Sequence, residues 1–142
     1  NRNYVLFLVG VFVMISRLAF ASSTIVAREE TKYFLRNGRM EKYEGQYEYT
    51  YFLDLEKNQL IRTRIYDYRS EKITRDETFY QIQNQLNSHP SNSDRFGLTP
   101  SIRAFGQTDA DTPELLIIKD DTVVSMVSSP RSVIISHLKR LK

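Results

Sequence analysis

The stretch from Glu44 to Tyr68 constrains the fold most, because it holds the longest run with one clear period. Between residues 47 and 55, Tyr and Leu alternate with polar residues, and only Phe52 breaks the alternation. Strict alternation over this length is typical of a half-buried β-strand. A polar turn at residues 56–59 leads into a second run, 60–68, rich in β-branched and aromatic residues. The stretch therefore predicts a long β-hairpin.

The first 21 residues have the pattern of an export signal. Residues 4–15 carry no charge, Arg17 follows them, and Ala19-Phe20-Ala21 fits the small-x-small rule that precedes a cleavage point. The apolar run is shorter than the roughly 20 residues that a spanning helix needs. We therefore expect residues 1–21 to be a secretory signal peptide. The alternative is an uncleaved anchor that attaches the protein to a membrane through residues 4–21. Either reading predicts an exported protein in a periplasmic, lumenal or extracellular space, soluble or membrane-anchored.

Charge and cysteine content exclude several kinds of function. Leaving out Arg2 and Arg17 reduces the 20 basic side chains to 18, against 17 acidic ones. This near-neutral balance argues against nucleic acid as a partner, since phosphate binding needs a concentrated positive face. The 142 residues contain no Cys, which excludes disulfides, thiolate metal sites and thiol nucleophiles.

The rest of the chain predicts alternating short elements. Residues 22–31 are polar and read as a linker, and Asn37-Gly38 between two β-capable runs predicts a first hairpin. A Thr-x-x-Glu capping box at residues 74–77, with Phe79, Ile82 and Leu86 at helical spacing, predicts a helix over 75–87. Residues 102–105, 113–119 and 122–128 read as strands. Ser129-Pro130 followed by an apolar stripe and a basic end predicts a helix over 130–141.

Together these elements predict a single α+β domain over residues 32–142. We expect an antiparallel or mixed β-sheet of about five to seven strands, made of the tyrosine-rich meander and a C-terminal hairpin. The two helices would pack on one face of the sheet.

The C-terminal part resembles a known fold. The segment 112–121 with its Pro113, the strand 122–127 and the element from Pro130 look like the last portion of the thioredoxin fold, in which a cis-proline begins a strand, a tight hairpin follows and a final helix packs back. The resemblance covers about 30 residues, and the Cys-x-x-Cys motif of that family is missing. It implies shared fold ancestry without redox chemistry, and it requires a cis peptide bond before Pro113.

No motif of a catalytic, cofactor or metal site is present. His89 lies in the polar stretch 88–101, and His137 lies beside the apolar stripe of the last predicted helix. Neither has a second histidine near it in sequence, which leaves a zinc site unsupported. Asp109, Asp111, Asp120 and Asp121 lack the spacing of a calcium loop and read as turn residues. We therefore expect no metal or cofactor, and we lean toward a protein that is not an enzyme.

The remaining candidate is an aromatic and basic surface on the main hairpin. Tyr and Arg supply contact area and hydrogen bonds at modest entropic cost, which suits protein binding. The candidate protein-binding residues are Tyr47, Tyr49, Tyr51, Arg62, Arg64, Tyr66 and Tyr68.

These observations lead to two hypotheses. The first is a non-catalytic exported domain that binds another protein or serves as an accessory subunit at the cell envelope. The second is a small-ligand-binding protein or a hydrolase-type enzyme that uses the loops at 88–101 and 106–112. A pocket that combines Arg103 with His89, Asp109 or Asp111 would favour the second.

Overall fold

The chain folds into an all-β, eight-stranded antiparallel barrel. The computed structural model describes residues 22–83, 102–107 and 111–142, and within them every regular element is a strand. The strands are β1 (Ser22–Arg36), β2 (Arg39–Glu44), β3 (Tyr47–Asp54), β4 (Gln59–Asp67), β5 (Lys72–Ile82), β6 (Ile102–Gln107), β7 (Pro113–Lys119), β8 (Thr122–Ser128) and β9 (Val133–Arg140).

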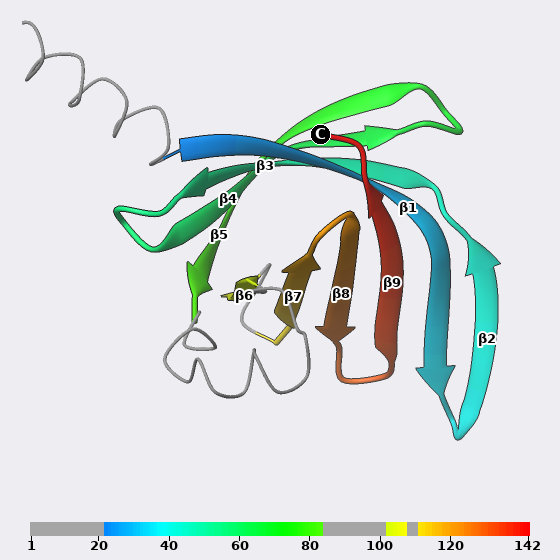
Figure 1. Ribbon diagram of the computed structural model, residues 1–142. Helices are drawn as coiled ribbons and strands as arrows, with labels where there is room; N and C mark the ends of the chain where they lie inside the picture. The colour runs from blue at the N-terminus through cyan, green and yellow to red at the C-terminus, as the bar shows by residue number, and fades with distance from the viewer. Residues whose placement is uncertain (1–21, 84–101, 108–110) are drawn as a thin grey trace, which may run out of the picture.

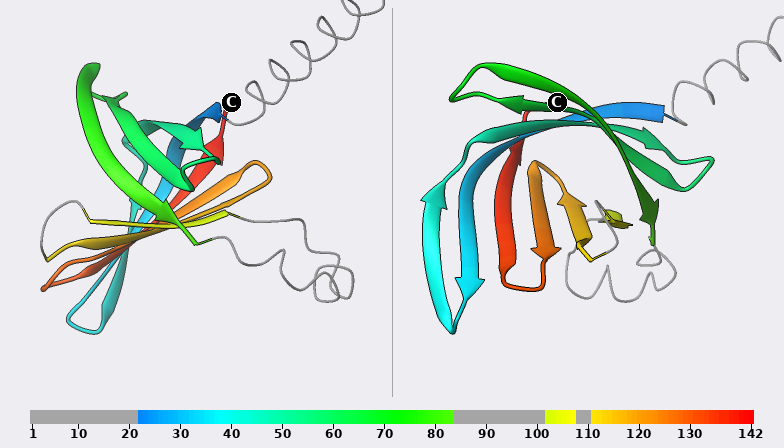
Figure 2. Two further views of the ribbon diagram at one scale, coloured as in Figure 1. Left: turned by 90° about the vertical axis from the view of Figure 1, so that its left-hand side faces the viewer. Right: turned by 180° about the vertical axis from the view of Figure 1, so that it is seen from behind.

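Strand β1 closes the barrel. One edge of β1 pairs with β9 from Ala27 to Leu35, and the other edge pairs first with β3 and then with β2. From β3 to β9 each strand pairs antiparallel with the next one along the chain, so the eight strands β1 and β3 to β9 form the closed barrel. β2 is the ninth strand of the sheet, and within the described residues it pairs with β1 alone. The long, bent β1 runs across the barrel in Figure 1, and the view from behind in Figure 2 shows the sheet curling round to it.

A bend at Gly45 separates β2 from β3, and the two strands pair with successive parts of the same edge of β1. Opposite the bend, the register of β1 shifts between Glu29 and Thr31, which marks a β-bulge. The Gly45 amide donates to the Glu30 carbonyl at 2.9 Å. A Cβ on Gly45 would lie 1.8 Å from the Glu29 carbonyl oxygen, so only glycine fits this close approach.

The predicted hairpins are confirmed. β1 and β2 are joined by Asn37 and Gly38, both with positive φ (52° and 71°), as a type I′ turn requires. The main hairpin of residues 44–68 is the pair β3 and β4, and β7 and β8 form the C-terminal hairpin. The short run at 102–105 is also a strand, β6.

The α+β prediction is wrong, because both predicted helices are strands. Residues 75–82 belong to β5, in which Thr78, Tyr80 and Ile82 are buried and their neighbours Glu77 and Phe79 are exposed. This period of two places β-branched and aromatic residues on a pleated surface, and it outweighs the helical spacing of Phe79 and Ile82. Residues 83–87 fall partly outside the described chain.

The last predicted helix is strand β9. Its run Val133-Ile134-Ile135 is β-branched, and Ser136 and Leu138 are buried while His137 and Lys139 are exposed. Ser129, expected to cap a helix, instead shapes the turn between β8 and β9, where its amide donates to the Ser132 carbonyl at 2.9 Å.

Two further expectations fail with the helices. Pro113 follows a trans peptide bond and the final element is a strand, so the resemblance to the thioredoxin fold does not hold. Residues 22–31, expected as a linker, form the first two thirds of β1. The expected signal peptide or anchor, residues 1–21, lies outside the described residues.

The barrel interior is divided between an apolar end and a polar region. The apolar end lies where β1 begins and β3 ends. Its buried side chains include Ile25, Leu53, Leu60, Ile82, Ala104, Leu116, Ile118, Val123 and Leu138. Further along the same inward rows the buried side chains become polar: Glu29, Arg62, Thr78, Glu114, Ser125 and Ser136. The buried polar side chains make this polar region the candidate functional site.

Candidate functional site

Arg62 on β4 is the centre of the polar region. Its guanidinium donates to the Asp76 carboxylate through Nε, to the Thr78 hydroxyl at 3.3 Å and to Glu114 Oε2 at 3.5 Å. A buried guanidinium is costly unless carboxylates compensate its charge and its donors are used. Here the neighbouring strand β5 supplies Asp76 and Thr78, and β7 supplies Glu114 from across the interior.

Glu114 on β7 connects this arginine to two more strands. Its Oε2 accepts from the Tyr80 hydroxyl at 2.7 Å, and its Oε1 accepts from the Ser125 hydroxyl at 2.8 Å. Both carboxylate oxygens are therefore held in place, and the Glu114 side chain is only 4% exposed. One carboxylate thus joins β4, β5, β7 and β8 in a single network, which fixes the geometry of the polar region.

Burial shifts the acid-base behaviour of this region. Burial, followed by the charge of Glu114, raises the pKa of Tyr80 far above its usual value. Burial likewise raises the pKa of Tyr49 and Tyr51. Burial alone would lower the pKa of Arg62, but Tyr80, Asp76 and Glu114 raise it overall. At neutral pH the three tyrosines are neutral hydrogen-bonding groups and Arg62 is a permanent cation.

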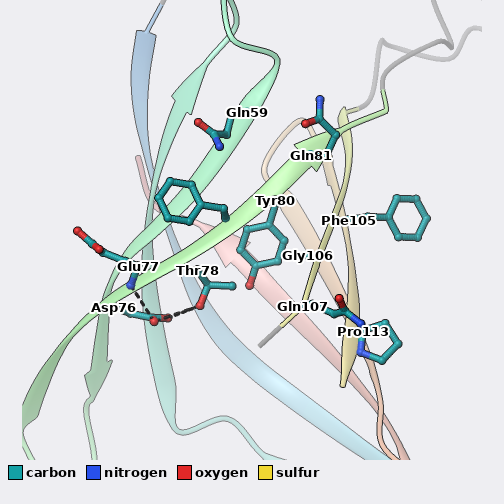
Figure 3. A pocket seen from close by; sticks show the side chains of 11 residues that line it. Gln59, Asp76, Glu77, Thr78, Tyr80, Gln81, Phe105, Gly106, Gln107 and Pro113 are labelled. Atoms are coloured by element: carbon teal, nitrogen blue, oxygen red, sulfur yellow. Dashed lines mark hydrogen bonds between the residues drawn. The ribbon is translucent and has the colours of Figure 1, made fainter. Parts of the chain in front are cut away.

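A cavity opens beside this network. Among the described residues, β5 pairs with β6 from Tyr80 to Ile82 only, so the two strands are not paired along residues 72–79. The cavity there has a volume of about 700 Å³. The cavity is open to solvent, and its lining includes the exposed side chains of Glu77, Phe79 and Phe105 together with Asp76, Thr78, Tyr80, Gly106, Gln107 and Pro113. Figure 3 shows Asp76, Thr78 and Tyr80 on one side of β5 and Glu77 on the other. The cavity therefore reaches the Arg62 network through Asp76, whose side chain is 22% exposed.

Gly106 on β6 forms the wall of the cavity opposite β5. A Cβ on Gly106 would lie 2.5 Å from Cδ1 of the Tyr80 ring, so the backbone of β6 packs directly against this ring. The close approach holds Tyr80 with its hydroxyl directed at Glu114.

A second buried ion pair lies on β1. Glu29 is 1% exposed, and its Oε1 lies 3.1 Å from the Lys32 ammonium and accepts from the Gln46 amide at 3.0 Å. Its Oε2 is buried and has no hydrogen-bond partner in the described part of the chain. The Lys32 ammonium also lies over the Tyr47 ring, 4.9 Å from its centroid.

The tyrosine and arginine candidates do not share one face. Tyr49, Tyr51 and Arg62 are largely buried, and the Tyr47, Tyr49 and Tyr51 rings follow one another at centroid distances of 6.1 and 6.2 Å. The Arg62 guanidinium lies 5.4 Å from the Tyr49 ring centroid. These residues form a row along the interior.

The other candidates of the hairpin lie elsewhere. On β3, Glu48 and Thr50 alternate with the inward tyrosines and therefore face outward. Their partners on β4 are Tyr66 and Arg64, which face outward as well. The Tyr68 hydroxyl donates to the Glu29 carbonyl at 2.8 Å, at the β1 bulge. Protein binding by this set stays a prediction.

The predicted ligand-pocket residues are not brought together in the described chain. Arg103 and Asp111 are exposed, and His89, Asp109 and the loop 88–101 lie outside the described residues. His137 is exposed, with its Nδ1 3.5 Å from Glu30. Asp120 and Asp121 form the turn between β7 and β8. Within the described ranges no group of three acidic or histidine side chains is arranged to hold a metal ion.

The sequence pattern indicates that Glu114 is buried, and the interpretation of residues 113–119 as a uniformly apolar strand missed this. Glu114, Leu116 and Ile118 have the same parity, so a carboxylate shares the buried face with two core residues. Asp76 and Thr78 precede Tyr80 and Ile82 in the same way on β5. A polar residue in phase with a buried row is the pattern that identifies such a site.

Comparisons with protein-family models, with curated proteins and with solved structures found no match for this chain. The described residues contain no helix long and apolar enough to span a membrane.

Proposed function

We propose that the protein is a non-catalytic binding protein whose barrel holds a small polar ligand. One observation carries the proposal: the cavity of about 700 Å³ lies beside a buried network of polar groups that several strands hold in place. Ligand sites are concave and combine apolar walls with a few fixed polar groups. An eight-stranded barrel has an interior of the size that either side chains or one small ligand can fill.

The lining indicates the chemistry of the ligand. The Asp76 carboxylate already accepts from Arg62, the Glu77 amide and the Thr78 hydroxyl, so a donor on the ligand would share its oxygens. The Tyr80 ring and Pro113 offer apolar contact. Arg62 is already neutralised by Asp76 and Glu114, so it serves to position Asp76. The cavity thus favours a ligand that donates hydrogen bonds, such as an amine or a polyol, over an anion.

The protein-binding hypothesis needs the tyrosines and arginines on an open surface. Tyr49, Tyr51 and Arg62 instead face the interior, and for this reason the proposal rests on the cavity. We retain export as part of the proposal, supported by the apolar start and the small-x-small pattern at Ala19 to Ala21. An exported binding protein without cysteines keeps its function independent of the redox state outside the cell.

A fragment screen tests this function. Small amines, polyols and carboxylates are added to the protein, and the melting temperature and the amide NMR shifts are recorded. We expect amines or polyols to raise the melting temperature, since a ligand that binds only the folded state stabilises it. The amide signals of Thr78, Tyr80 and Glu114 should move.

Two inward variants and one outward control make the screen specific. Asp76→Asn and Thr78→Val should each weaken binding of the amines or polyols about tenfold, the loss expected for one hydrogen bond to a charged or buried group. Glu48→Gln, on the outer face of β3, should leave binding unchanged. The proposal fails if none of these fragments binds, or if binding is unaffected by both inward variants.

A further inference from the structure

The first part of β5 is an unpaired sheet edge. Among the described residues, β5 pairs with β4 on both sides of a register shift at Asp76 and Glu77, and with β6 only from Tyr80 to Ile82. Within this described part of the chain, the segment Lys72–Phe79 therefore has one edge without a partner strand. The Glu77 amide donates to the Asp76 carboxylate at 2.9 Å, which supplies an acceptor that a neighbouring strand would otherwise provide. An open edge of this length is a template for pairing with another strand.

The outward face of this segment alternates apolar and charged residues. Asp76, Thr78 and Tyr80 are the less exposed positions of β5, so the odd-numbered residues face outward. Ile73 and Phe79 are large apolar side chains that are 60% and 52% exposed. Arg75 and Glu77 lie between them and are also exposed. The outward order is thus apolar, basic, acidic, apolar.

When a second copy of this segment runs antiparallel to the first, its basic residue lies opposite the acidic residue of the first copy, and its apolar residues lie opposite apolar ones. We propose that two copies of the chain associate by antiparallel pairing of their β5 edges around a two-fold axis at Asp76. In this register Arg75 lies opposite Glu77 of the second copy, and Ile73 lies opposite Phe79. Directly opposed residues in an antiparallel pair share a face, so all four side chains meet on the outer surface. A two-fold axis repeats each pair, which gives two ion pairs and two apolar pairs.

The inward face is compatible with the same register. Thr74 lies opposite Thr78 of the second copy, a pairing that favours sheets. The two Asp76 carboxylates lie opposite each other at the axis as a like-charge pair, and the Arg62 guanidinium of each chain compensates its own carboxylate. The second strand would occupy the cavity beside residues 76–81, so dimerisation through this edge and ligand binding there exclude each other.

Two alternative axes lack this complementarity. An axis at Arg75 would place the apolar Ile73 opposite the charged Glu77. β2 also has an open edge, but an axis at Lys42 would place Met40 opposite Glu44. The charge order of β5 therefore points to a second copy of this chain as the partner.

A charge exchange tests the pairing. The molar mass is measured by analytical ultracentrifugation over a range of protein concentrations, for the wild type and three variants. We expect a dimer in the wild type. Arg75→Glu and Glu77→Arg each place like charges opposite one another and should weaken dimerisation about tenfold. The double variant Arg75→Glu with Glu77→Arg should restore it, because both pairs are re-formed with the signs exchanged.

Two controls test whether a weaker dimer results from the lost pairing or from misfolding. Circular dichroism should show the same strand content in all variants, and Arg39→Glu on the β2 edge should not change the dimer. A monomer at every concentration would overturn the inference, as would a double variant that stays as weak as the single ones. The dimer and the ligand site use the same part of β5, because Asp76 lies at the two-fold axis and Thr78 lies opposite Thr74. Their tests remain distinguishable, since the charge exchange of Arg75 and Glu77 is read as molar mass and the Asp76→Asn and Thr78→Val variants are read as ligand affinity.

Discussion

Replacing Arg62 by Met should lower the free energy of unfolding by about 3–5 kcal/mol. The substitution keeps most of the side-chain volume but removes the donors to Asp76, Thr78 and Glu114. Among the described residues, Glu114, with its side chain 4% exposed, then keeps the hydroxyls of Tyr80 and Ser125 as its partners and lacks a cation to compensate its buried charge. Urea denaturation followed by circular dichroism measures the loss.

Two comparisons identify the cause of that loss. Arg64→Met changes the outward neighbour, which stacks on Tyr66, and should cost less than about 1 kcal/mol. Adding Glu114→Gln to Arg62→Met should recover part of the stability, because it removes the unpaired charge. A loss below about 1 kcal/mol for Arg62→Met would show that the network does not hold the barrel together.

Replacing Gly45 by Ala should destabilise the barrel by about 3 kcal/mol, at the upper end for overpacking. The new Cβ would lie 1.8 Å from the Glu29 carbonyl oxygen and 2.7 Å from the Tyr68 hydroxyl. The nearest atoms belong to the backbone of β1, which cannot rotate away as a side chain could. β1 and the β2–β3 bend must therefore separate, which also disturbs the Glu29 bond to the Gln46 amide.

Gly38 provides the matched control. It lies in the turn between β1 and β2 with a φ of 71°, and a Cβ there would meet nothing within 4 Å. Gly38→Asn should cost less than about 1 kcal/mol, because Asn adopts positive φ more readily than most residues. Comparable melting temperatures for Gly45→Ala and Gly38→Asn would contradict the close approach at the bulge.

The local signals of the sequence predicted hairpins well. Asn37-Gly38 specified its turn, and the alternation of Tyr47, Tyr49 and Tyr51 specified β3, because both signals lie within a few residues. The tyrosines were placed correctly on one face of that strand. Which side of the sheet is interior depends on how the barrel closes, and no local pattern contains that information.

The helix predictions failed where two periods coincide. Phe79 and Ile82 fit a helical stripe, but Thr78, Tyr80 and Ile82 fit a strand, and burial inside the barrel selects the second. Ser129-Pro130 suits a helix start as well as a turn, and the β-branched run 133–135 was the better guide. Arg62 and Glu114, which are directly bonded in the network, lie 52 positions apart in sequence, so only the parity of Asp76 and Glu114 could have indicated the network.

The closure of β1 on β9 supports the whole account, because without it there is no interior. Tyr33 and Ile135 are opposed in this pairing, and the chain has no native cysteine to interfere with a cross-link. Opposed Cα atoms in an antiparallel pair lie about 4.5–5.5 Å apart, within the range that a disulfide spans. The double variant Tyr33→Cys with Ile135→Cys should therefore form an intramolecular disulfide under mild oxidation. Tyr33→Cys with Ile134→Cys, whose side chain faces the other side of the sheet, should not. Failure of the first pair, or equal cross-linking of both pairs, would contradict the closed barrel.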